Sequence, residues 1–120
     1  MIEKRAFHRV PFATQAILAD NDKSLSGWLN DISFGGALVR LEHIPLPPED
    51  SKFFLTLYTG EGALPLEMVA EVAYVSVPMV GLRFTSIDQD TRERLGRLMF
   101  DIESELYKRR MENGAKHLSA

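Results

Sequence analysis

The sequence contains no cysteine among its 120 residues. Without thiols, the chain can form neither a disulfide framework nor a thiolate metal site. Long apolar runs are missing as well, because nothing approaches the roughly 18 uninterrupted apolar residues of a membrane-spanning helix. The first residues, MIEKRAFHR, carry cations but no apolar run of signal-peptide length. We therefore expect a cytoplasmic protein that does not insert into membranes.

An excess of basic charge is also missing, since 17 acidic and 14 basic side chains leave a formal charge of −3. Binding of DNA or RNA polymers without specificity needs a dominant basic surface, so it is not expected. The charge is unevenly placed. Residues 1–12 carry Lys4, Arg5 and Arg9 against a single acid, whereas residues 13–87 hold nine acids and four bases. An acidic body with a small cationic N-terminal segment suits the capture of one compact dianion better than a polymer.

The length and the apolar share of 45% fit one domain with a single core. Short apolar segments separated by turn-forming residues predict six strands. These segments are residues 14–19, 25–32, 37–41, 53–58, 64–77 and 80–84. Short strands at this spacing, with little helix between them, favour a small antiparallel barrel over a parallel α/β sheet. We expect a mainly β protein.

Several residues refine the predicted strands. Gly27 interrupts the second strand, which indicates a bulge or a close backbone approach. Trp28 is expected to anchor the core. The fifth segment alternates at a period of two, which places five side chains on one face: Leu66, Met68, Ala70, Val72 and Tyr74.

The C-terminal part predicts a helix over residues 88–112. Asp88 is a suitable N-cap, and Asp90 lies in the first turn, where the helix dipole favours negative charge. An apolar stripe follows at helical spacing: Leu95, Leu98, Met99, Ile102 and Leu106. We expect this helix to cover part of the barrel or a partner, and residues 113–120 to form a flexible tail.

The first group of residues with binding chemistry is the cationic segment before the first strand. Arg5 and Arg9 lie four positions apart, with Lys4 beside them. The planar donor fork of arginine matches phosphate oxygens, or O6 and N7 of guanine, and its flat face stacks on a base. The alternative is a solvated N-terminal tail.

The second group is the segment DISFGG at residues 31–36. The carboxylate of Asp31 accepts hydrogen bonds and suits a ligand edge rich in N–H groups, such as N1 and N2 of guanine. Ser33 is able to donate to a nearby oxygen, and Gly36 permits a positive φ and a close approach to a ligand. The alternative is a turn in which the Asp and Ser side chains satisfy local N–H groups.

Together, the two groups resemble the signature of the PilZ domain, a bacterial receptor module for the second messenger cyclic di-GMP. That family carries an RxxxR motif on its N-terminal loop, here RAFHR at residues 5–9, and later a (D/N)xSxxG motif, here DISFGG at residues 31–36. The segment VGLRF at residues 80–84 is similar to the family's last strand. The resemblance extends from about Lys4 to the start of the final helix. It implies a six-stranded antiparallel β-barrel of the split-barrel type with a C-terminal α-helix.

The resemblance also implies the site residues. Arg5 and Arg9 would grip the phosphates and guanine faces of cyclic di-GMP. Asp31 and Ser33 would hold a guanine edge. The glycines Gly35 and Gly36 complete this ligand-binding set, with Gly36 leaving room for the base.

Two positions leave alternatives open. Many family members have arginine where this chain has Lys4, which keeps the charge but loses the fork and the stacking plane. Either one ligand or an intercalated pair therefore binds per domain. Tyr74 lies where some relatives place an aromatic residue that stacks on the ligand, and it is equally compatible with a place in the barrel wall.

The resemblance implies a receptor in which residues 1–12 form the ligand-binding loop and residues 13–87 the barrel. Ligand-induced ordering of the loop would pass the signal to a downstream protein partner. The alternative function is a PilZ-like protein-interaction scaffold that does not bind the nucleotide.

Catalysis and cofactors are not expected. No nucleophile has a recognisable base beside it, and no pair of carboxylates accompanies a histidine. The three histidines, His8, His43 and His117, lack metal-ligand spacing. The sequence therefore predicts a binding protein with no metal and no cofactor other than its ligand.

Overall fold

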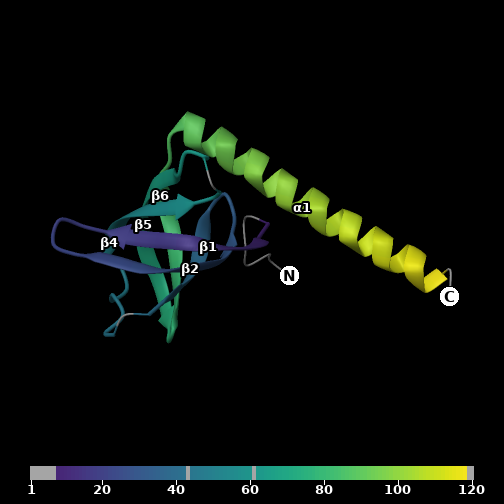
Figure 1. Cartoon of the computed structure of the whole chain (residues 1–120). Helices are drawn as coiled ribbons and strands as arrows, with labels where there is room; N and C mark the ends of the chain where they lie inside the picture. The colour runs from purple at the N-terminus through teal and green to yellow at the C-terminus, as the bar shows by residue number, and fades with distance from the viewer. Residues whose placement is uncertain (1–7, 43, 61, 119–120) are drawn as a thin grey trace, which may run out of the picture.

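Six antiparallel strands close into a barrel, and a single long helix extends from one end of it (Figure 1). The computed structural model describes residues 8–42, 44–60 and 62–118, with the side chains of the helix described as far as residue 113. In chain order, the elements are β1 (Val10–Ala19), β2 (Ser24–Ile32), β3 (Gly36–Leu41), β4 (Lys52–Tyr58), β5 (Leu66–Ser76), β6 (Met79–Ser86) and α1 (Gln89–Leu118). The order around the barrel is β1-β2-β3-β6-β5-β4, and pairing of β1 with β4 closes it. The predicted barrel with a C-terminal helix is confirmed.

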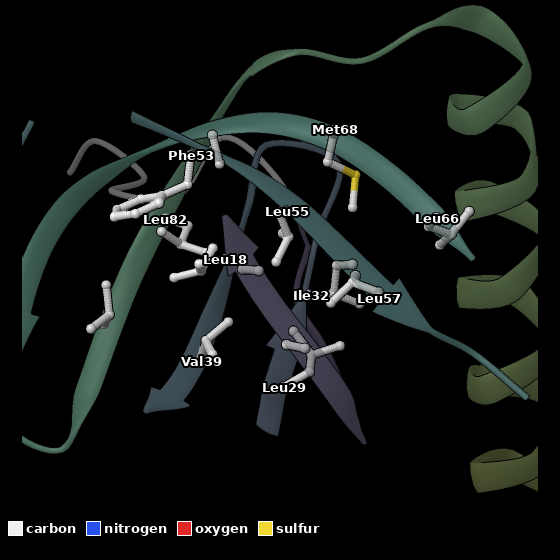
Figure 2. Close-up of a cluster of buried hydrophobic side chains, with 14 of the residues drawn as sticks. Leu18, Leu29, Ile32, Val39, Phe53, Leu55, Leu57, Leu66, Met68 and Leu82 are labelled. Atoms are coloured by element: carbon white, nitrogen blue, oxygen red, sulfur yellow. The ribbon is translucent and has the colours of Figure 1, made fainter. Parts of the chain in front are cut away.

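The barrel interior is filled by the alternate residues of each strand. In β4, Phe53, Leu55 and Leu57 are buried, whereas Phe54 and Tyr58 between and beyond them are exposed. Figure 2 shows the inward-pointing side chains gathered between the strands. This alternation is what a closed sheet with one apolar face requires.

Two predictions for β2, at Gly27 and Trp28, have opposite outcomes. A Cβ atom on Gly27 would lie 2.1 Å from the carbonyl oxygen of Arg40 in β3, so the predicted close backbone approach is confirmed. The prediction that Trp28 anchors the core is wrong, because its side chain is 51% exposed. Trp28 immediately precedes the buried Leu29, and neighbouring residues of a strand point to opposite faces.

The predicted inward face of β5 is correct for four residues and wrong for the fifth. Leu66, Met68, Ala70 and Val72 are buried, whereas Tyr74 is 40% exposed. The pairing with β6 shifts between Val72 and Tyr74, since Val72 lies opposite Leu82 and Tyr74 opposite Gly81. This bulge inserts one residue and turns Tyr74 outward.

Helix α1 begins as predicted and runs further than predicted. The Oδ1 atom of Asp88 accepts a hydrogen bond from the backbone N–H of Thr91 at 2.7 Å, which confirms the N-cap. The helix continues to Leu118, so the predicted end at residue 112 is wrong. The segment beyond it contains one glycine and no proline, and a glycine weakens a helix by only about 1 kcal/mol. At the other end of the fold, β1 starts at Val10, ahead of the predicted boundary at residue 13.

The first turns of α1 dock on the barrel. Leu95 and Met99 belong to the buried core, and Leu98 and Ile102 pack against it. On the neighbouring side, a Cβ atom on Gly96 would lie 3.1 Å from the ring of Phe34. Phe34 of the segment DISFGG therefore packs against the helix, with Arg92 over its ring, while the later turns of α1 extend away from the barrel (Figure 1).

Candidate functional site

The start of β1 positions the described part of the first motif. Val10 is fully buried and pairs with Ile32 of β2, which fixes the backbone next to Arg9. The preceding residue, His8, lies beside the helix, with its Nε2 atom 3.3 Å from Oε2 of Glu103. Lys4 and Arg5 lie outside the described residues. Of the three cations in the first motif and beside it, the structure therefore gives the position of Arg9.

Arg9 meets the second motif. Its Nη1 atom lies 3.6 Å from Oδ1 of Asp31, and both side chains are largely shielded from solvent. Two further bulges act here. Residues 12 and 13 of β1 face the single Asn30 of β2, and the pairing of β2 with β3 also shifts at Asn30. The bulges change the direction of the strand end, where Arg9 of the first motif meets Asp31 of the second at one rim of the barrel.

The Asp31 carboxylate is only partly satisfied. Its Oδ2 atom accepts a hydrogen bond from the side-chain amide of Asn30 at 3.2 Å. Its Oδ1 atom is buried and accepts no hydrogen bond from any described residue. A buried acceptor beside a cation, at ion-pair but not hydrogen-bond distance, has capacity for a further donor.

Ser33 shapes the loop that follows Asp31. Its hydroxyl accepts hydrogen bonds from the backbone N–H groups of Gly35 and Gly36, each at 3.1 Å, and it donates to the carbonyl of Gly36 at 3.3 Å. The side chain is buried. The hydroxyl is thus used within the turn, as in the local alternative considered for this motif, and a ligand contact by Ser33 stays a prediction.

The two glycines seat the loop against β6. A Cβ atom on Gly36 would lie 2.1 Å from the carbonyl oxygen of Leu82, so the neighbouring strand makes the close approach at this position. The carbonyl of Gly35 accepts a hydrogen bond from the N–H of Phe84 at 2.9 Å. Gly36 does not have the positive φ that it would tolerate; among the described residues, positive φ values occur at Asp50 and Gly62.

Tyr74 lies on the outer face of the sheet that continues from this loop. A Cβ atom on Gly81 would lie 2.2 Å from the ring of Tyr74, so the ring covers this buried glycine. Gly81 pairs with Leu38 of β3, two positions after Gly36. The Tyr74 ring and the loop therefore belong to one surface over β3, β6 and β5, and the ring is available for stacking from its outer side.

Arg83 is a second arginine on this surface, and the sequence reading gave it no role. It lies opposite Gly36 on one side and Glu71 on the other. Its Nε atom donates a hydrogen bond to Oε1 of Glu71 at 3.0 Å, and Nη2 contacts the same oxygen. The sequence does contain a signal for this residue. Arg83 alternates with the inward Leu82 and Phe84, which predicts that its side chain points outward.

The charge of the described site is balanced. Arg9 is paired with Asp31 and Arg83 with Glu71. Lys4 and Arg5, which are predicted to add positive charge to the site, lie outside the described residues. Within residues 8–42, 44–60 and 62–118, no group of three histidine or acidic side chains is arranged to hold a metal ion. His43 lies outside the described residues, as does the side chain of His117.

Comparisons with known proteins agree with the fold. The family model of the PilZ domain matches residues 3–101. The solved PilZ domain of YcgR from Escherichia coli with c-di-GMP is similar at a TM-score of 0.77 and 19% identity, covering 89% of this chain and 97% of that one. The PilZ domain of CeSA from a cellulose-synthesizing bacterium gives 0.65 and 19% identity over 80% of this chain and 98% of that one.

A longer relative is also similar. The inhibitor of motility MotI from Bacillus subtilis gives a TM-score of 0.73 and 18% identity, with 89% of this chain covering 53% of that one. The chain thus spans about half the length of MotI. No curated protein sequence matches the chain. At these identities the solved structures establish the fold. In the described part of the chain, no helix has the length and apolar character needed to cross a membrane.

Proposed function

Because this chain belongs to the PilZ domain family, whose model matches residues 3–101, we propose that it is a receptor that binds cyclic di-GMP without chemical conversion. Two proteins that share its fold, YcgR from E. coli and MrkH from K. pneumonia, have been solved in complex with c-di-GMP. The family assignment and the intact motifs support the same ligand here. A cytoplasmic second-messenger receptor is also consistent with the absence of cysteine.

The observation that carries the proposal is the meeting of Arg9 with Asp31. A guanidinium and a carboxylate side by side complement cyclic di-GMP, since the first binds phosphate oxygens or O6 and N7 of guanine and the second accepts from N1 and N2. At 3.6 Å the two groups form an ion pair without filling their hydrogen-bonding capacity. The unsatisfied Oδ1 atom of Asp31 supports a ligand donor at this point.

The remaining proposed contacts surround this pair. Lys4 and Arg5 would add cations from the N-terminal segment, and the turn held by Ser33 would present Gly35 and Gly36 beneath the guanine. Tyr74 would stack on the ligand from the outer face of β5. Arg83 lies opposite Gly36 and two positions after Gly81, the residue opposite Tyr74, so it would join these contacts by exchanging Glu71 for phosphate. The ligand-binding set proposed is Lys4, Arg5, Arg9, Asp31, Ser33, Gly35, Gly36 and Tyr74, with Arg83 as an additional contact.

The signal would pass through the segment before β1. Charge-assisted bonds from Arg5 and Arg9 to the ligand would fix this segment against Asp31, and a downstream protein would recognise the resulting surface. Backbone NMR relaxation of residues 1–12, recorded with and without cyclic di-GMP, tests this relay. Relaxation rates that are identical in the two states would exclude it.

Isothermal titration with cyclic di-GMP tests the binding itself. Arg9→Ala and Asp31→Ala should each lose most of the affinity, at least tenfold, because each removes a charged group that would hydrogen-bond the ligand directly. Arg109→Ala is the matched control, since Arg109 also forms an ion pair, with Glu105, but lies far along α1. Affinity in the first two variants equal to that of Arg109→Ala would refute the proposal. The same titration gives one or two ligands per chain.

A nucleotide-free interaction scaffold is the second candidate, and one observation favours it. The Ser33 hydroxyl is buried and fully engaged with the loop backbone, so part of the second motif has a structural use independent of any ligand. A flat titration of the unaltered protein up to about 1 mM ligand would support this candidate.

A further inference from the structure

The middle turns of α1 carry an apolar stripe that is separate from the one on the barrel. Phe100, Tyr107 and Met111 are 57–70% exposed, and Ser104 lies among them. The four positions are spaced by four, three and four residues, which is the seam spacing of a two-helix coiled coil. This seam, defined as Phe100, Ser104, Tyr107 and Met111, is a helix face of the kind that pairs with another helix.

The seam points away from the barrel. At about 100° per residue, it lies on the side of α1 opposite the docking stripe that contains Leu95 and Met99. The later turns of the helix extend clear of the strands (Figure 1). A second helix therefore has access to the seam without displacing the contacts that hold α1 on its own barrel.

We propose that the seam binds the same seam of a second copy of this chain, with the two helices antiparallel. The charges beside the seam are the reason. One flank carries Asp101 and Lys108, and the other carries Glu103 and Arg110, each pair seven residues apart. In an antiparallel pair, each flank faces the same flank of the second helix, so every acid meets a base.

The antiparallel register also matches the shapes of the side chains. It places Phe100 level with Met111 of the second copy, and Ser104 level with Tyr107. Ser104 lies in a shallow depression bounded by Phe100, Glu103, Tyr107 and Lys108, which has room for an incoming ring. Large side chains thus meet small or flexible ones in both layers.

A parallel pair of helices would form fewer contacts between opposite charges. There each flank faces the opposite flank, so Glu103 meets Lys108, but Asp101 faces Gly96 and Arg110 faces Ala115. Half of the charged side chains then lack an opposite charge. Either arrangement has a two-fold axis and ends at a dimer, so the charges decide between them in favour of the antiparallel pair.

The proposed contact is small, at about three helical turns, and lies below the ~1,200 Å² typical of stable complexes. The dimer should therefore be weak and depend on concentration. Sedimentation velocity of the full-length chain from about 10 µM to about 1 mM, without cyclic di-GMP, covers this range. Because no ligand is present, the outcome does not depend on whether the proposed receptor function is correct.

The seam is tested by the double variant Phe100→Ser/Tyr107→Ser, which should weaken dimerisation at least tenfold. Phe54→Ser is the matched control, since Phe54 is equally exposed but lies on the barrel, and it should dimerise like the unaltered chain. Circular dichroism checks that α1 stays helical in each variant. A chain that is monomeric at about 1 mM, or a seam variant that dimerises normally, would overturn the proposal.

The antiparallel orientation is tested with the flank of Asp101 and Lys108, because Glu103 also contacts His8. Asp101→Lys should weaken the dimer, since it places like charges opposite each other. Adding Lys108→Asp to the same chain should restore it. Failure of the double variant to recover would show that these two side chains do not face each other across the dimer.

Discussion

At the scale of single residues, the rim of the barrel depends on glycines that have no room for a side chain. Gly36 is the sharpest case. The carbonyl oxygen of Leu82 occupies the space that a Cβ atom would need, and this backbone atom cannot rotate aside. The same turn is held by Ser33 and by the bond from Phe84 to Gly35. The loop geometry at the proposed ligand site is therefore inseparable from barrel packing.

Gly36→Ala should destabilise the protein by about 1–3 kcal/mol, because β3 and β6 must separate to admit the methyl group. Urea denaturation followed by tryptophan fluorescence measures the change. Gly60→Ala is the control, since a Cβ atom there meets nothing within 4 Å and its stability should stay within about 0.5 kcal/mol. Equal stability of the two variants would contradict the packing role of Gly36.

Residue identity alone predicted some positions and misled at others. Of the motif residues that the structure describes, Arg9 and Asp31 meet at the rim, and the ligand contacts that the resemblance implies stay a prediction. Trp28 was misplaced because its size suggested burial, although the parity of Leu29 places it outside. Tyr74 was misplaced because a bulge changes parity through pairing with β6, and that pairing is not visible in the sequence of β5 itself.

At the scale of elements, α1 is held at its start and free toward its end. The cap at Asp88 and the burial of Leu95 fix the first turns. The backbone N–H of Thr91, and then its side chain, lower the pKa of the Asp88 carboxyl below its ordinary value. The carboxylate form is thus favoured by folding, and the cap links the stability of the helix to pH.

The sign of this linkage gives a prediction. A carboxyl whose pKa is lowered in the folded state stabilises that state above its ordinary pKa, and the contribution is lost as the pH falls below about 4. Asp88→Asn keeps a capping side chain but cannot titrate, so melting temperatures from about pH 2 to pH 6 should fall less steeply than in the unaltered chain. At neutral pH, Asp88→Ala should have a lower melting temperature than the unaltered chain, because it loses the cap.

A second carboxyl, that of Asp20, also makes stability depend on pH and remains in the Asp88 variants. The pKa of Asp20 is lowered too, by hydrogen bonds from the backbone N–H groups of Asp22 and Lys23. Its acid-sensitive contribution should remain in Asp88→Asn, so the variant keeps a reduced rather than an absent pH dependence. A profile unchanged from that of the unaltered chain would mean that Asp88 does not cap the helix in solution.

At the scale of the whole molecule, local signals specify strands and helix, whereas pairing specifies the barrel. The six apolar segments and the helical stripe were recognisable from periodicity. The closing pair of β1 with β4 and the bulges in the β1–β2, β2–β3 and β5–β6 pairings arise between residues far apart in the chain. Their effects, including the outward turn of Tyr74 and the approach of Arg9 to Asp31, required the folded arrangement.

The molecule also separates two surfaces. The proposed ligand site lies at the barrel rim around Arg9 and Asp31, and the seam lies on the middle turns of α1, on the side turned away from the barrel. Among residues 105–113, whose exposure the structure describes, Leu106 alone is not exposed. Removing the chain after Ser104 therefore deletes half of the seam while keeping Leu95, Met99 and the partner of His8.

A chain ending at Ser104 should fold and bind cyclic di-GMP, but it should not dimerise. We expect its melting temperature to stay within a few degrees of the full-length value, because the buried contacts of α1 remain. Its affinity for cyclic di-GMP should change less than about twofold, whereas concentration-dependent sedimentation should disappear. Leu95→Ala in the full-length chain gives the contrast, since emptying this buried site should cost about 2–5 kcal/mol. A truncated chain that binds cyclic di-GMP much more weakly would show instead that the outer helix supports the ligand site, and that the two surfaces act as one.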